Sequence, residues 1–164
     1  VSGEKKTGDF LPDPIIKSYE FLLKSGIYVE GQVVFGGFYT YSRYSGPREA
    51  VFTALCRKNM GCNYFIIGRD HTGVGNFYGE DDNRRFIEEI GEIGITPIFF
   101  DAVGFDPNNK QYRPMDSSDE MEPISATRFR TAILNRERVP DWFVRQSVQD
   151  ILFSELDAGR RICY

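Results

Sequence analysis

Histidine and cysteine are scarce in this chain, and neither shows the spacing of a metal site. His71 is the single histidine among 164 residues, and the three cysteines are Cys56, Cys62 and Cys163. An odd number of cysteines without metal-ligand spacing argues against a zinc site and favours reduced thiols in a cytoplasmic protein. We therefore predict no protein-bound metal.

Long apolar runs and an excess of positive charge are also missing. No run approaches the 18 residues of a membrane span, and no signal-peptide pattern is visible, so we predict no membrane association. The net charge of −4 does not attract polyanions, so any anion site must be local. The aromatic residues do not alternate with a basic stripe, which argues against nucleic-acid binding.

What is present is an ordinary globular composition, 41% hydrophobic and 27% charged, with alternating strand and helix patterns. This alternation predicts an α/β fold with a parallel sheet, followed by a helical subdomain. The boundary is placed between 1–122 and 123–164, and the acidic, proline- and asparagine-rich stretch at 104–122 is predicted to be a loop or hinge. Helices are expected at 14–24, 47–58, 81–92, 125–135 and 144–156, and strands at 32–35, 64–67 and 95–100.

The most informative stretch is the apolar run 64–67, which ends abruptly in a glycine-rich loop at 68–75. Arg69, Asp70 and His71 lie in that loop, and Gly68 opens it. One interpretation is a phosphate site, because glycines expose backbone N–H groups and arginine adds a planar cation. The other is a glycine connection in which Arg69 and Asp70 only stabilise the turn. The spacing alone does not separate the two.

Two further segments combine arginines with a helix start. Ser125, Thr127 and Arg130 could hold a phosphate at a helix N-terminus, or could form an ordinary N-cap with solvated arginines. Arg43 and Arg48 flank a glycine turn, where a helix entry with a surface ion pair is the simpler interpretation.

Taken in order, these segments resemble the second half of ATP sulfurylase (sulfate adenylyltransferase). Gly-Arg-Asp-His-x-Gly at 68–73 is highly specific to that family. The resemblance implies a Rossmann-like nucleotidyltransferase fold and the reaction of ATP with sulfate to adenosine 5′-phosphosulfate and pyrophosphate, with Mg²⁺ on the ATP. The other matching segments are Arg-Tyr-Ser-Gly-Pro-Arg-Glu-Ala at 43–50, Arg-Lys-Asn-Met-Gly-Cys at 57–62, Ile-Ser-Ala-Thr-Arg-Phe-Arg at 124–130 and Val-Pro-Asp-Trp-Phe at 139–143.

The resemblance also implies roles for individual residues. Thr72 stands where the family usually has an alanine whose backbone contacts sulfate. Phe100 and Asp101 would border the adenine. Ser125, Thr127 and Arg130 remain candidate phosphate contacts. The residues expected to contact ATP in the glycine loop are Gly68, Arg69, Asp70 and His71.

The sequence also departs from the family. It contains neither the Gln-x-Arg-Asn segment nor, with one histidine, the His-x-x-His segment, so its catalytic residues are not identified. We therefore expect the C-terminal part of such an enzyme, incomplete without the N-terminal region of the same enzyme and forming a homo-oligomer. The alternatives are a non-catalytic nucleotide-binding or scaffold module, and a related transferase for another oxyanion, which Thr72 alone supports.

Overall fold

The two apolar runs in the middle of the chain form a pair of parallel strands. The computed structural model describes residues 7–68, 77–79, 81–115 and 121–164. In it, β1 (Tyr64–Ile67) pairs with β2 (Thr96–Phe99), so that Ile67 lies opposite Phe99. The predicted α/β character and small parallel sheet are confirmed, whereas the Rossmann-like topology stays a prediction.

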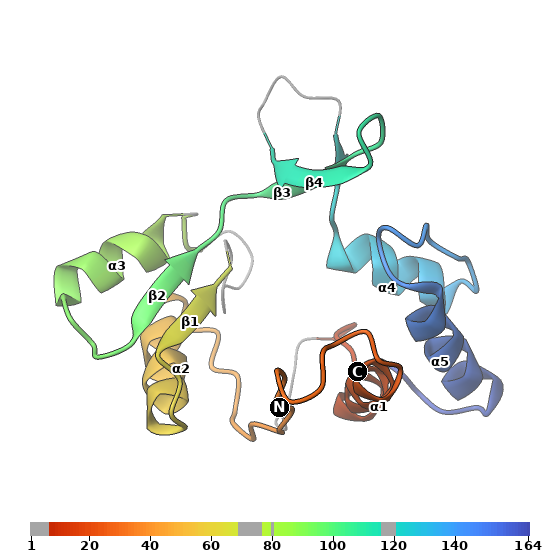
Figure 1. Cartoon of the computed structure of the whole chain (residues 1–164), viewed down its shortest axis with the longest axis horizontal. Helices are drawn as coiled ribbons and strands as arrows, with labels where there is room; N and C mark the ends of the chain where they lie inside the picture. Colours follow the sequence, from red (N-terminus) through yellow and green to blue (C-terminus); the bar gives the residue numbers. More distant parts are fainter. Residues whose placement is uncertain (1–6, 69–76, 80, 116–120) are drawn as a thin grey trace. The chain divides into compact units, whose positions relative to one another are not determined.

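Two helices accompany this sheet, as the sequence predicts. α2 (Pro47–Asn59) precedes β1, and α3 (Asp82–Ile90) lies between β1 and β2 in the chain (Figure 1). Apolar residues recur at helical spacing in the helices and form short runs at the strands, so both contribute buried side chains. Those that become buried in this part are Ala50, Ala54, Ile67, Ile87 and Ile95.

The prediction of a loop at 104–122 is wrong for most of the described residues in this range, because they form strands of an antiparallel sheet. β3 (Val103–Asp106) lies between β4 (Gln111–Pro114) and β5 (Glu122–Pro123). Pro, Asn and Asp made this stretch look like a loop, but among them only Pro107, Asn108 and Asn109 lie in the connection between β3 and β4. Turn residues between two short strands are a hairpin signal that the composition of the whole stretch concealed.

Asp106 explains why the hairpin turns where it does. Asp106 is 3% exposed, and its Oδ1 accepts hydrogen bonds from the backbone N–H groups of Asn108, at 2.9 Å, and Asn109, at 3.2 Å. The side-chain amide of Asn109 and the guanidinium of Arg113 donate to the other oxygen. Hydrogen bonds from Asn109, first from its side chain, lower the pKa of Asp106 below its ordinary value.

The strand predicted at 32–35 does not form. These residues have no strand hydrogen-bond pattern, and Val34 is 97% exposed. A β-branched run becomes a strand only where another strand offers backbone partners and a face to pack on. Among the described residues, this run has no such partner strand.

The chain divides into two compact units, which we call the terminal unit and the central unit. The terminal unit combines Val1–Tyr41 with Ile124–Tyr164, and the central unit is Ser42–Pro123. Both sheets therefore belong to the central unit. The predicted division into 1–122 and 123–164 stays a prediction.

The terminal unit contains three helices that the sequence predicts to within two residues at each end. They are α1 (Pro12–Lys24), α4 (Ala126–Leu134) and α5 (Gln146–Asp157). Within the described part of the chain, none of the helices is both long and apolar enough to cross a membrane. An isolated bridge between Phe10 and Cys163 ties the start of the unit to its end. The buried core of this unit consists of Phe129, Ala132, Ile133, Val139, Leu152, Ile162 and Cys163.

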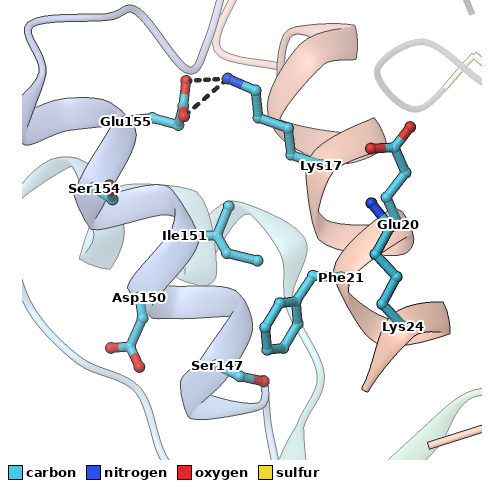
Figure 2. A pocket seen from close by; sticks show the side chains of 9 residues that line it. All are labelled: Lys17, Glu20, Phe21, Lys24, Ser147, Asp150, Ile151, Ser154 and Glu155. Carbon is cyan, nitrogen blue, oxygen red and sulfur yellow. Dashed lines mark hydrogen bonds and ion pairs between the residues drawn. The ribbon is translucent and has the colours of Figure 1, made fainter. Parts of the chain in front are cut away.

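Glu155 joins α1, α5 and the C-terminal segment through one carboxylate. Its two oxygens each lie 2.9 Å from Nζ of Lys17, as Figure 2 shows, and Arg160 donates to them at 2.6 and 2.8 Å. Hydrogen bonds from Arg160 and Lys17 lower the pKa of Glu155 to about 2. The carboxylate is therefore a link between segments that lie far apart in the sequence.

Stability of the terminal unit should consequently fall in acid. The folded-state pKa of Glu155 lies below its ordinary value of 4.5, so its contribution is complete above pH 4.5 and is lost as the pH falls towards about 2. We expect the urea midpoint of Glu155→Gln to lie below that of the wild type at pH 6, and the two to converge by about pH 2 to 3. A difference that stayed constant over this range would contradict the assignment.

Candidate functional site

A cavity of about 230 Å³ lies at the carboxyl ends of β1 and β2, within the central unit. Three of the predicted site residues, Gly68, Phe100 and Asp101, line it. The carboxyl ends of parallel strands are where α/β proteins commonly bind ligands. The described residues that line it are Ile67, Gly68, Asp81, Asn83, Arg84, Phe99, Phe100, Asp101, Ala102 and Met115.

The strand register explains why residues 32 positions apart meet here. Ile67 is opposite Phe99 in the parallel pair, so Gly68 and Phe100 leave the sheet at the same edge. Ile67 is 1% exposed and fixes the end of β1, while Phe100 is 53% exposed and available for contact. The sheet therefore brings together the start of the glycine loop and the predicted base-binding strand end.

The start of α3 closes another side of the cavity, which the sequence analysis did not predict. Asp82 anchors the start of α3, since its carboxylate accepts the Gly79 N–H at 2.8 Å and also pairs with Arg85. The guanidinium of Arg84 lies over the ring of Phe99, with its central carbon 4.8 Å from the ring centroid. The sequence signal that could have found these residues was the position of the helix in the chain. A helix that follows a strand-end loop places its first turn near that loop.

Asn83 is the most buried polar side chain of this lining, at 6% exposed. Among the residues that the structure describes, its Oδ1 has no hydrogen-bond partner. A buried acceptor without a donor costs about 1–3 kcal/mol of stability. Such a group therefore requires an explanation, and the cavity beside it offers one.

Four predicted site residues cannot be located in this geometry. Arg69, Asp70, His71 and Thr72 lie outside the described residues. The choice between a phosphate site and a glycine turn at 68–75 is therefore not tested. At Gly68, the last described residue before them, an added Cβ would have no atom within 4 Å.

Ser125, Thr127 and Arg130 belong to the terminal unit and make local contacts there. Ser125 is the N-cap of α4, because its Oγ accepts the N–H of Arg128 at 3.2 Å. Arg130 donates to the hydroxyl of Thr127 at 3.2 Å and lies 3.6 Å from a carboxylate oxygen of Asp9. These contacts within the protein explain the positions of the three side chains, and no ligand is needed for that. Their phosphate-binding role stays a prediction.

The arginine segment at 43–48 is organised by a buried carboxylate. Glu49 is 5% exposed, and its oxygens accept the backbone N–H groups of Arg43, at 3.0 Å, and Ser45, at 3.1 Å. The guanidinium of Arg43 lies over the ring of Phe52, 5.0 Å from its centroid. This arrangement fixes the entry into α2, which agrees with the predicted helix entry, whereas the surface ion pair of that interpretation stays a prediction.

The terminal unit contains two larger hollows, and none of the predicted site residues lines either. One is a groove of about 550 Å³ between α1 and α5, with Phe21 and Ile151 among the side chains in view in Figure 2. The other is a largely apolar cavity of about 350 Å³ beside Phe10 and Phe129. Of these three hollows, the strand-end cavity is the one lined by predicted site residues, namely Gly68, Phe100 and Asp101.

Comparison with known proteins agrees with the motifs. A sequence model of the ATP-sulfurylase family matches residues 1–155. The sulfate adenylyltransferase of Symbiobacterium thermophilum is 37% identical over 169 residues, covering 97% of this chain and 42% of that protein. The enzymes so named from Pyrococcus abyssi and Aeropyrum pernix are each 36% identical, over 94% and 96% of this chain. The chain spans 41% and 42% of their lengths, so more than half of each relative has no counterpart in it.

Proposed function

Because the chain belongs to the ATP-sulfurylase family, we propose that it provides the ATP-binding region of a sulfate adenylyltransferase. The reaction joins ATP and sulfate to give adenosine 5′-phosphosulfate and pyrophosphate. The observation that carries the proposal is the cavity at the ends of β1 and β2, lined by Gly68, Phe100 and Asp101. The alternative is a nucleotide-binding or scaffold module without catalysis.

The nucleotide would lie with its base in the cavity and its phosphates over the glycine loop. A volume of about 230 Å³ is below the range of about 300–1,000 Å³ that is typical for complete small-molecule sites, so it suits only part of a nucleotide. Phe100 offers an exposed ring to a base. Backbone N–H groups beyond Gly68, with Arg69 and His71, would hold the phosphates and compensate their charge.

Catalysis in this proposal consists of positioning and charge stabilisation. A sulfate oxygen attacks the α-phosphorus of ATP in line, the bond to the bridging oxygen breaks, and pyrophosphate leaves. Within the described residues, no group of three or more His, Cys, Asp or Glu side chains could hold a metal ion. We propose that Mg²⁺ enters as the magnesium complex of ATP, and that the backbone at Thr72 contacts sulfate.

Turnover would require more than this chain. Its one histidine excludes a His-x-x-His segment, and its relatives are more than twice as long as the part that it matches. We propose that another region of the same enzyme supplies the remaining sulfate- and ATP-binding groups and that the complete protein is a homo-oligomer. Synthesis of adenosine 5′-phosphosulfate by the isolated chain at the rate of a complete enzyme would contradict this.

Thermal unfolding with added ligand tests the binding function directly. ATP, adenosine 5′-phosphosulfate or pyrophosphate at millimolar concentration should raise the melting temperature of the chain. A ligand present at 100 times its dissociation constant stabilises the folded state by about 2.7 kcal/mol. No shift with any of the three would favour the scaffold alternative.

Arg69→Ala tests the phosphate contact at the level of one residue. If Arg69 contacts phosphate and not its own loop, we expect the apo melting temperature to stay within about 2 °C of the wild type, as for a substitution that costs less than about 0.5 kcal/mol. Most of the ATP-induced shift should be lost. Arg145→Ala, at an exposed arginine of the terminal unit, is the matched control and should keep the shift. If Arg69 only stabilises its loop, the apo protein will instead lose stability while the ATP-induced shift persists.

A further inference from the structure

We propose that Asn83 is a specificity-determining residue that recognises the 6-amino edge of adenine. This inference rests on the proposed function, and it adds a residue and a chemical selectivity to it. Asn83 lies in the first turn of α3 and is among the residues that line the strand-end cavity. Neither the glycine loop nor the family motifs point to it.

The Asn83 amide is buried, and its oxygen is unpaired within the described part of the chain. The side chain is 6% exposed, and its Oδ1 lacks a hydrogen-bond partner among the described residues. The terminal torsion of asparagine is broad, so the amide can turn its oxygen towards a donor in the cavity. A ligand amino group would satisfy this acceptor, and binding would recover the cost of leaving it unpaired.

The charges around the cavity show which part of a nucleotide it accepts. Among the described residues, the lining includes two acidic residues, Asp81 and Asp101, and one basic residue, Arg84. Two acids repel phosphate groups, but they favour a neutral ring that carries N–H donors. The phosphates therefore belong outside the cavity, on the side of the glycine loop that begins at Gly68.

The flat groups of the lining favour an aromatic ring. Phe99 and Phe100 lie side by side in the chain at the end of β2, and the guanidinium of Arg84 stacks on Phe99. Phe100 keeps 53% of its surface exposed, which leaves its ring available for stacking against a base. An aromatic wall with an adjacent amide is suited to a planar heterocycle.

Adenine matches the amide better than a 6-oxopurine does. An asparagine amide can pair with adenine at two points, accepting from the 6-amino group and donating to the neighbouring ring nitrogen. Hypoxanthine and guanine carry a carbonyl oxygen at that position. The amide would then have to turn its NH2 towards this oxygen, so Oδ1 would lose the 6-amino donor, and the acidic side chains of Asp81 and Asp101 would disfavour the carbonyl oxygen. A site built to hydrogen-bond a group rejects an analogue that lacks it, because the buried partner stays unpaired.

The test compares ATP, ITP and inorganic tripolyphosphate in thermal titrations of the full chain. The wild type should bind ATP about tenfold or more tightly than ITP, as one hydrogen bond replaced by a repulsive contact predicts. Tripolyphosphate, which has no base, should bind more weakly than ATP. In Asn83→Ala the ATP-to-ITP ratio should fall to within about threefold, whereas Asn63→Ala, at an exposed asparagine, should keep the wild-type ratio.

The apo protein provides a second measurement. Alanine has the highest helix propensity and removes the unpaired oxygen, so apo Asn83→Ala should be as stable as the wild type or more stable. Equal affinities of the wild type for ATP and ITP, or an unchanged ratio in Asn83→Ala, would overturn the inference and leave the proposed function intact. Absence of any ATP-induced shift in the wild type would overturn both.

Discussion

Gln149→Ala should lower the free energy of unfolding by about 3–4 kcal/mol, because it leaves buried backbone groups without partners. Gln149 is completely buried, and its Oε1 accepts the N–H of Val139 at 3.0 Å. Its Nε2 donates to the carbonyl of Val139 at 2.9 Å and to that of Val144 at 2.6 Å. One side chain thus holds Val139 and Val144, which flank the turn with Trp142 and Phe143 in the connection between α4 and α5.

Melting curves followed by tryptophan fluorescence measure this effect, since Trp142 is the single tryptophan of the chain. For a protein of this length, we expect the transition to fall by roughly 10 °C. Gln146→Ala is the matched control. Gln146 is only half-buried, and it shares the carbonyl of Val139 with Gln149, so its loss should cost less than about 1 kcal/mol. Equal losses in the two variants would contradict the role given to Gln149.

Gly46→Ala should destabilise the central unit by about 3 kcal/mol, for two independent reasons. The backbone of Gly46 has φ +52° and ψ −123°, which residues with a Cβ rarely adopt. A Cβ at this position would also lie 2.5 Å from Cδ2 of Tyr78, so the ring would have to move. Gly46 is the N-cap of α2 and accepts the N–H of Ala50, so the strain falls on the entry into that helix.

Hydrogen exchange of the amides in α2 and α3 is the appropriate measurement, because it localises the loss to the central unit. Gly36→Ala is the control, since Gly36 has open space around it and no positive φ, and it should change stability by less than about 0.5 kcal/mol. Introducing Gly46→Ala into Tyr78→Ala separates the two causes. The collision disappears in that background, and only the backbone cost should remain. An undiminished loss there would show that the ring contact contributes nothing.

The elements that could be predicted from the sequence are those whose signals are local. Ser125 caps α4 through a contact three residues away, and Pro47 opens α2. The run at 64–67 begins and ends where the apolar residues do. By contrast, the strand expected at 32–35 failed because β propensity does not provide a partner strand.

The candidate site could be predicted only in part, for the same reason. The sequence predicted site residues at the strand ends, and three of them line the cavity: Gly68, Phe100 and Asp101. Asn83 and Arg84 carry no motif, and their place in the lining depends on where α3 packs. That Asn83 is buried and its Oδ1 lacks a partner among the described residues is a property of the packed structure, which no spacing of residues reveals.

By itself, the sequence determined the helices, the two parallel strands and, through its motifs, the family to which the chain belongs. Helix periodicity, capping and apolar runs act over a few residues, so they can be recognised without knowledge of the fold. Only the tertiary structure decided that Glu155 joins Lys17 across 138 residues and that α3 closes a cavity at the ends of β1 and β2. These contacts arise because distant segments bury surface together and must satisfy their polar groups where they meet.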